Sequence, residues 1–277
     1  MRKFIFAVAL VFSVLGSSAQ IDTIYSGSKR IPCTVVEVAA DVVKFTYPDE
    51  TMLNSLFVNS INKIVFKSGR VQQFAAQNSF RTIKSPADWE NVSLASVESE
   101  IRGLYKLGEV SSKAAGTTEL SNQERVKMRA IRKLKMDAAM MGANIIYVIN
   151  MRSEGNKVDW SGNGSSQAAE TSITGVSYTN DPIEFAEMQH FLASHAGRSM
   201  VARSKFTLRK GDSDMRITDI DTPFRFSNVV NESGTVFVEG TIDGAKTDRF
   251  QVVFLSADGF CLRYSDKSAV YVYKIII

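Results

Sequence analysis

Histidine, cysteine and tryptophan are scarce in this sequence, with two of each among 277 residues. The two cysteines, Cys33 and Cys261, stand near opposite ends of the chain and form no C-x-x-C pair, so a dithiol redox mechanism has no support. In an oxidising compartment they could pair. Alternatively, they remain two buried thiols in separate β modules, and the sequence leaves both possibilities open.

The two histidines are the only imidazole bases that the chain offers. His190 and His195 lie five residues apart on an expected helix, about 140° around its axis, so they cannot both face one site. Ser194 lies beside His195, but no G-x-S-x-G turn presents it as a nucleophile. A hydrolase that uses His190 or His195 is therefore an alternative. A histidine within hydrogen-bond reach of Ser, Asp or Glu in a concave, water-accessible pocket would decide for it against a non-catalytic protein.

Clusters of acidic residues and histidines that could hold a metal are also missing from the sequence. Ten methionines, with Met188 close to His190, suggest copper(I), because thioether and imidazole groups are suitable soft ligands. No closely repeated M-x-x-M array accompanies them. We therefore expect no metal site and no cofactor, and we keep a periplasmic metal-binding protein as a second alternative.

Long hydrophobic runs are limited to the first residues. Phe4 to Leu15 form an apolar run after Arg2 and Lys3, and the small residues 16–19 follow, which is the pattern of a secretory signal peptide. The run is shorter than the roughly 20 residues that span a bilayer, and no later stretch approaches that length. We expect residues 1–19 to be a signal peptide, no transmembrane segment, and a protein that is periplasmic, associated with the outer envelope, or secreted.

An excess of basic charge is missing as well. Removing residues 1–19 leaves 31 basic residues against 29 acidic ones, a net charge of only +2. Nucleic-acid binding depends on neutralising phosphates with clustered Lys and Arg, so we expect no nucleic-acid partner. The mature chain is longer than a typical small domain with one hydrophobic core, which predicts several small domains.

Both ends of the mature chain have the pattern of β modules. In the first, β-branched and aromatic runs at 31–38, 42–47, 60–66 and 71–74 alternate with turn residues, which predicts an antiparallel module over 20–84. In the last, runs at 235–242, 249–255, 260–264 and 270–275 are separated by Asp243-Gly244 and Asp258-Gly259, a strong hairpin signal. This predicts an antiparallel meander over 201–277, either a barrel or a sandwich.

Between them, residues 85–200 have the pattern of an α+β domain with one main helix on a sheet. Ser121 and Glu124 stand in the relation of a capping box, which places the start of this helix at Ser121. Its packed face should contain Leu134 and Ala138, and Gly142 should end it. The apolar run 145–149 predicts a central, buried strand that includes Ile146 and Val148. A second helix is expected from Pro182 to about Ala196.

The junction Ala138-Ala139-Met140-Met141-Gly142-Ala143-Asn144, followed by the apolar strand 145–151, resembles that of small envelope α/β domains. These are the stress-sensor lipoprotein of the Rcs pathway and the putative heavy-metal-binding YbjQ-type family. The resemblance covers residues 89–179 and implies a fold and an envelope location. The sensor's cysteines have no counterparts here. The flanking β modules resemble those of uncharacterised exported bacterial proteins, which implies no activity.

The expected helix carries the densest charge of the chain, with six bases between Arg125 and Lys135. Either a solvated helix face or a docking surface for an envelope protein or an anionic surface explains such a stripe. Two methionines fall among the bases, where polar groups are usual, which also suggests that another domain covers part of this face. The candidate interaction face consists of Arg125, Arg129, Arg132, Lys133, Lys135, Met136 and Met140. The sequence thus predicts an exported, non-catalytic interaction or ligand-binding module.

Overall fold

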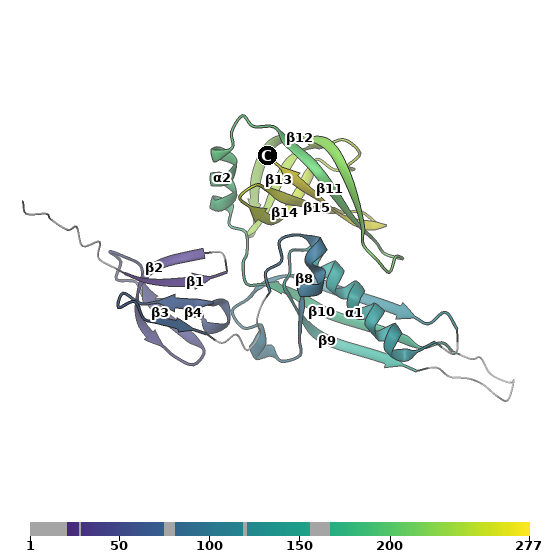
Figure 1. Ribbon diagram of the computed structural model, residues 1–277, viewed down its shortest axis with the longest axis horizontal. Coiled ribbons are helices and arrows are strands. Elements are labelled where there is room, and N and C mark those ends of the chain that lie inside the picture. The colour runs from purple at the N-terminus through teal and green to yellow at the C-terminus, as the bar shows by residue number, and fades with distance from the viewer. Residues whose placement is uncertain (1–20, 28, 75–80, 119–120, 156–166) are drawn as a thin grey trace, which may run out of the picture.

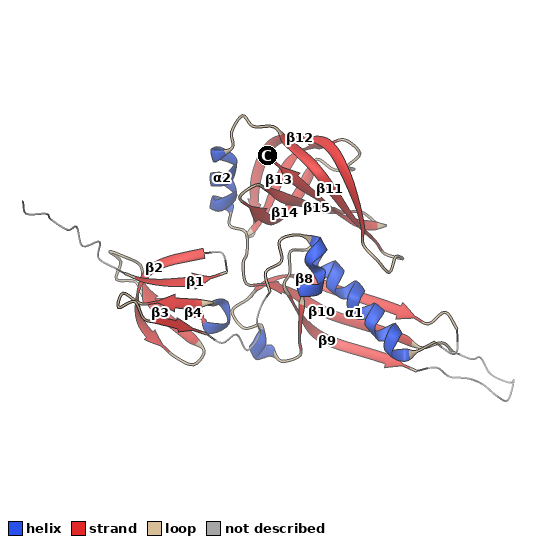
Figure 2. Cartoon of the chain, viewed as in Figure 1, coloured by secondary structure: helices blue, strands red, loops and turns tan. Residues whose placement is uncertain are grey.

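The computed structural model describes residues 21–27, 29–74, 81–118, 121–155 and 167–277. The expected signal peptide, residues 1–19, lies outside this range. Of the described residues, 52% lie in strands and 17% in helices, and the strands form three sheets, so this part of the chain is β-rich with few helices (Figure 2). No helix in the described part of the chain is long and apolar enough to cross a membrane.

The N-terminal module is a six-stranded antiparallel sheet in the order β4-β3-β2-β1-β5-β6. Its strands are β1 (Asp22–Ser26), β2 (Lys29–Val38), β3 (Val42–Thr46), β4 (Asn54–Phe57), β5 (Lys63–Val65) and β6 (Val71–Gln73), with a short 3-10 helix η1 (Val58–Ser60) after β4. The buried carboxylate of Asp22 accepts hydrogen bonds from the backbone N–H groups of Val35 and Lys67, at 2.8 and 2.7 Å. These bonds join distant segments around the small apolar core.

The central module is a four-stranded sheet with helix α1 on one face, in the order β7-β9-β10-β8. Its strands are β7 (Ser93–Ala95), β8 (Tyr105–Ala115), β9 (Ile145–Glu154) and β10 (Glu170–Thr179); α1 spans Gln123–Met140, and two short 3-10 helices, η2 (Pro86–Asn91) and η3 (Glu98–Glu100), precede β8. β7 pairs with β9 in parallel, and the other pairs are antiparallel. Ala130, Leu134 and Ala138 are fully buried against the sheet.

The cap of α1 differs from the expected capping box. Asn122 is the N-cap, and its side-chain oxygen accepts a hydrogen bond from the backbone N–H of Arg125 at 3.1 Å. The Ser121 hydroxyl instead accepts from the backbone N–H of Thr118, so it closes the preceding turn. Asn is as good an N-cap as Ser, and here it is the residue with the extended backbone that a cap requires. Gly142, just after the helix, has the expected positive φ of 83°.

The strand after α1 is less buried than its apolar run suggested. Ile145 and Ile146 are fully buried, because β9 lies between β7 and β10 at this point. Val148 is only partly buried, and Ile149 is 62% exposed. β7 covers only the first three residues of β9, and the bulge at Ile149 turns that side chain toward solvent.

The C-terminal module is a closed six-stranded antiparallel barrel, one of the two expected arrangements. Its strands are β11 (Met200–Arg209), β12 (Arg216–Glu232), β13 (Thr235–Ile242), β14 (Arg249–Ser256), β15 (Gly259–Ser265) and β16 (Ala269–Ile276). β16 closes the barrel by pairing with both β15 and β11. Phe224, Phe250 and Phe260 pack edge to face in its interior.

The second helix, α2 (Phe185–Ser194), belongs to the barrel core. Met188 is fully buried and Phe191 is 8% exposed, and both pack with Phe260 and its neighbours. The sequence assigned this segment to the 85–200 domain. The spacing of its apolar residues predicts a helix, but it does not show against which module the helix packs. Figure 1 shows α2 beside the barrel and the barrel above α1.

Candidate functional site

Helix α1 lies between two sheets and is buried on two sides. One side packs on the central sheet through Ala130, Leu134 and Ala138. The other packs on the outer face of the barrel, where Met136 and Met140 are 1% and 0% exposed. They contact a cluster of barrel side chains that consists of Phe206, Leu208, Val253, Phe254, Cys261 and Val272. The two methionines therefore belong to an interface between modules and to no solvent-facing surface, which corrects their place in the expected interaction face.

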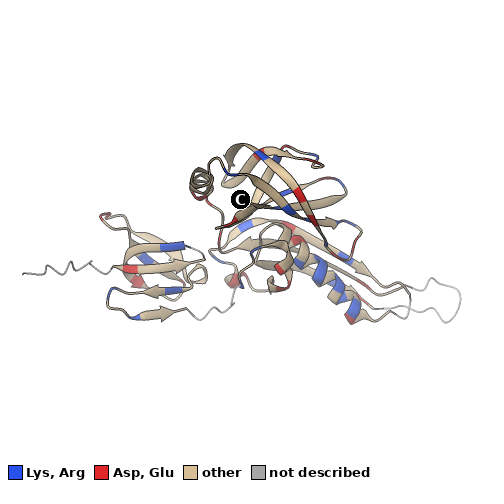
Figure 3. Cartoon of the chain, turned by 45° about the horizontal axis from the view of Figure 1, so that its top comes forward, with Lys and Arg blue, Asp and Glu red and all other residues tan. Residues whose placement is uncertain are grey.

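The predicted bases divide into two groups. Arg132 and Lys133 reach the barrel: Arg132 Nη2 lies 2.6 Å from the Asp214 carboxylate, and Lys133 Nζ donates to the carbonyl oxygen of Lys210 at 2.5 Å. Methionine packing and these polar contacts together hold the barrel on the helix. Part of the basic stripe is thus used inside the molecule. Figure 3 shows the basic positions that follow one another along the helix below the barrel.

Arg125, Arg129 and Lys135 do not contact the barrel through the hydrogen bonds described. Arg129 Nη2 donates to the carbonyl oxygen of Ala115 at 2.7 Å, and Arg125 has an exposed side chain. Lys135 Nζ lies 3.3 Å from the carbonyl oxygen of Glu90. Burial lowers the pKa of Lys135, and the nearby Glu90 carboxylate partly offsets this effect.

One buried charged pair faces the interface between α1 and the barrel. Burial raises the pKa of Asp137 above its ordinary value of 3.8, and the positive charges of Arg263 and Lys133 oppose that rise. Burial likewise lowers the pKa of Arg263, and Asp137 opposes that fall. The two side chains therefore stabilise each other's charged form across the interface without forming a direct ion pair.

A shallow groove of about 320 Å³ runs along the solvent side of α1, where η2 packs against the helix. We call its apolar lining residues the floor, namely Trp89, Met128 and Ile131, and its charged lining residues the rim, namely Glu90, Arg129, Arg132 and Lys135. The guanidinium of Arg132 lies 5.2 Å from the centre of the Trp89 ring. Met128 is 59% exposed.

The sequence analysis did not identify the floor residues of this groove. It did identify the three basic rim residues, Arg129, Arg132 and Lys135. Met128 precedes Arg132 and Lys135 by four and seven residues, which is the spacing of one helix face, and this signal could have identified it. Trp89 lies far from α1 in the sequence, so no periodicity connects it to the helix.

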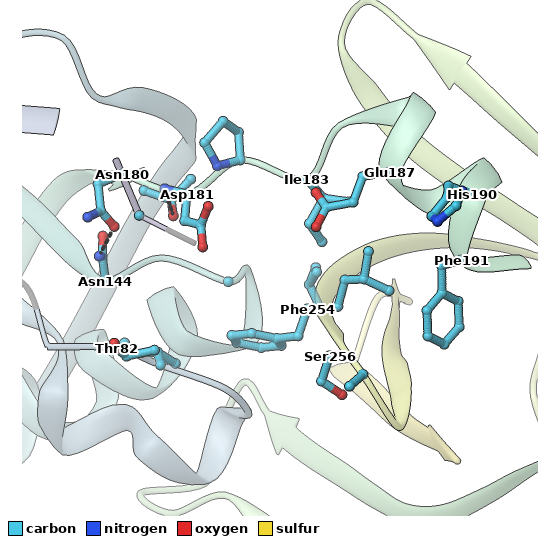
Figure 4. Close-up of a pocket in the computed structure, with 18 of the residues that line it drawn as sticks. Thr82, Asn144, Asn180, Asp181, Ile183, Glu187, His190, Phe191, Phe254 and Ser256 are labelled. Carbon is cyan, nitrogen blue, oxygen red and sulfur yellow. Dashed lines mark hydrogen bonds between the residues drawn. The ribbon is translucent and has the colours of Figure 1, made fainter. Parts of the chain in front are cut away.

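A second concavity, a cleft of about 650 Å³, opens where the three modules meet (Figure 4). Gly27 and Asn62 line it from the N-terminal module, and Asn144 and Thr179 line it from the central module. Residues 180–183, α2 and residues 253–257 complete its walls. The Asn144 amide donates to the side-chain oxygen of Asn180 at 2.5 Å, which fixes the two amides against each other.

His190 and His195 both line this cleft, but the geometry gives no nucleophile and base pair. The Ser194 hydroxyl lies 3.0 Å from His195 Nδ1 in a concave pocket, so the distance criterion for the hydrolase alternative is met. However, Nδ1 also lies 2.9 Å from the carbonyl oxygen of Phe191. A carbonyl only accepts, so Nδ1 carries the proton and cannot take one from Ser194. The Ser194 hydroxyl itself donates to the same carbonyl at 2.8 Å, and both side chains therefore cap the end of α2.

The cysteines are both buried and unpaired, in β2 and β15. Burial raises the pKa of Cys33 to about 11 and that of Cys261 to about 12. Within the described residues, no three His, Cys, Asp or Glu side chains gather in a group that could hold a metal ion. No protein-family model matches the chain, and comparisons with curated proteins and with solved structures also gave no match.

Proposed function

We propose that this chain is an exported, non-catalytic binding protein of the cell envelope, and that its α1–Trp89 groove receives an acidic, partly apolar segment of a partner protein. The observation that carries the proposal is the exposed Met128 side chain on the floor of a groove with three basic rim residues. Export rests on the signal-peptide pattern of residues 1–19.

The chemistry of the groove indicates the kind of partner. An exposed methionine beside a tryptophan offers an apolar anchor site, and Trp, Met and Arg are enriched at protein interfaces. The rim bases have spare donors, since a guanidinium has five N–H groups and an ammonium three. Arg129, Arg132 and Lys135 outnumber Glu90 and Asp214 around the groove, so an acidic segment complements it.

A protein segment fits this groove better than a membrane surface does. The rim bases are held by Ala115, Asp214 and Glu90, so their charges have defined positions around a concave floor. Fixed charges and a concave apolar site suit a side chain with a neighbouring carboxylate, whereas a bilayer presents a diffuse charged plane. Each exposed ion pair would add only about 0.2–1 kcal/mol, so the apolar anchor should carry most of the affinity.

The test uses a fluorescent helical peptide of Leu and Glu and a second peptide with Gln in place of each Glu. The acidic peptide should bind more tightly, and added salt should weaken it. Met128→Asp should weaken binding by about tenfold or more, since it replaces the anchor site with a repelling charge. Met52→Asp is the matched control, because Met52 is 69% exposed on the N-terminal module.

Three outcomes would contradict the proposal. Equal binding of both peptides would exclude charge complementarity, and equal loss in the Met128→Asp and Met52→Asp variants would exclude the groove. If neither peptide binds but anionic vesicles sediment with the parent and not with Met128→Asp, the surface binds membranes and the protein partner is wrong.

A further inference from the structure

The cleft between the three modules has an unusual balance of charge. Asp181 and Glu187 are its acidic side chains, and the described residues that line it include no Lys or Arg. Figure 4 shows both carboxylates on the side of the cleft opposite the Phe254 ring, directed toward the open space between them. Acidic side chains with no Lys or Arg among the lining residues favour a cation over an anion as a ligand.

The two carboxylates have different roles. The Asp181 carboxylate lies against the turn at Gly27, where a Cβ atom would stand only 2.7 Å from Oδ1, so it helps to join the linker to the N-terminal module. Glu187, in the first turn of α2, is exposed and makes no ion pair with any residue that the structure describes. Its neighbour Glu184 already binds Lys29, at 2.5 Å. Glu187 is thus the carboxylate available to a ligand.

The remaining walls suit the apolar part of a small molecule. Ile183, Phe191 and Phe254 are among the residues that line the cleft, and the two aromatic side chains are each 8% exposed. Aromatic rings attract organic cations as well as apolar groups. A cavity of about 650 Å³ lies within the usual range for small-molecule sites.

From these observations we propose that the cleft binds a small organic cation, with an ammonium or amidinium group at Glu187 and an apolar group against Ile183 and Phe254. The site does not depend on the α1–Trp89 groove, because the two concavities share no lining residue. Since its walls come from all three modules, the bound cation would also connect them.

The experiment compares benzylamine, benzyl alcohol and benzoate, which share a ring and differ in charge. Ligand-observed NMR on the full chain should detect benzylamine at millimolar concentration, weaker binding of benzyl alcohol, and no binding of benzoate. Glu187→Gln, which keeps the shape of the side chain, should weaken benzylamine by about tenfold and leave benzyl alcohol unchanged. Glu109→Gln, at an exposed position of β8, is the control and should bind like the parent.

Bound benzylamine should also raise the melting temperature of the parent more than that of Glu187→Gln, because a ligand stabilises the state that binds it. Three results would overturn the proposal: equal binding of benzylamine and benzoate, an unchanged affinity in Glu187→Gln, or no binding of benzylamine at all. None of them bears on the groove, whose test uses other variants and other probes.

Discussion

The carbonyl oxygen of Val253 lies 2.5 Å from the position that a Cβ atom on Gly142 would occupy. Gly142 follows α1 in the central module and Val253 lies on β14 of the barrel, so the missing side chain lets the two modules approach closely. The same glycine also has the positive φ that ends the helix.

Gly142→Ala should therefore lower the free energy of unfolding by about 2 kcal/mol or more, from a strained φ together with the clash against Val253. Gly197→Ala is the matched control, since Gly197 has a φ of 79° after α2 and a Cβ atom added there would have nothing within 4 Å. Urea denaturation of both variants separates the strain of the positive φ, which both share, from the clash with Val253, which only Gly142→Ala has. An equal decrease in the free energy of unfolding of both variants would show that the barrel accommodates the new methyl group without strain.

Ala138→Arg should cost about 3 kcal/mol or more, because Ala138 is fully buried between α1 and the sheet and a charge there would have no partner. The measurement is again chemical denaturation, with Ala186→Arg on the exposed side of α2 as the control. A melting temperature within a degree or two of the parent would contradict the packing of α1 on the sheet.

The pH dependence of stability should reveal the buried Asp137 carboxylate. Its pKa is raised in the folded protein, mainly by burial, so the folded state holds its proton more tightly than the unfolded state does. This contribution to stability is complete below the ordinary pKa of 3.8 and is lost as the pH rises through the folded pKa. The stability of Asp137→Asn relative to the parent should consequently increase with pH over this window.

Denaturation curves at several pH values between mildly acidic and neutral conditions measure this difference. Asp212→Asn, at an exposed position, is the comparison variant for the change of an acid to its amide. A constant difference between Asp137→Asn and the parent would mean that Asp137 is solvated in the folded protein.

The thiols of Cys33 and Cys261 should resist alkylation at mildly alkaline pH. Both are buried, and burial raises their pKa values to about 11 and about 12, so little reactive thiolate forms. Mass spectrometry after iodoacetamide treatment should show no adduct on the folded chain. After denaturation without a reductant it should show two adducts, whereas a disulfide would leave none.

The sequence predicted those features that depend on residues close together in the chain. The Asp-Gly turns at 243 and 258, the glycine after α1 and the buried Leu134, Ala138 and Ile146 all follow from turn chemistry or helical period. The N-cap is Asn122 and not Ser121, and the helix starts at Gln123, because several polar residues there can cap and only the backbone conformation selects one.

The sequence predicted that another domain covers part of the α1 face, but not which domain or which residues, because that depends on contacts between distant segments. A helical wheel placed Met136 and Met140 beside the bases, but only the packed barrel shows that they are buried while Met128 is exposed. Trp89 lies against α1, and α2 packs against the barrel. The periodicity of the sequence predicts neither contact, because each joins separate segments. The function and location proposed from the sequence remain predictions.

The position of α1 between two sheets imposes an order on folding. The central sheet can form and bury Leu134 during synthesis, before the barrel strands are complete. Met136 and Met140 then stay exposed to solvent until the barrel has formed. The barrel closes only when β16 has paired with β11 and β15. Until these pairs have formed, the apolar helix face and the unpaired strand edges are exposed, and both favour association with other chains.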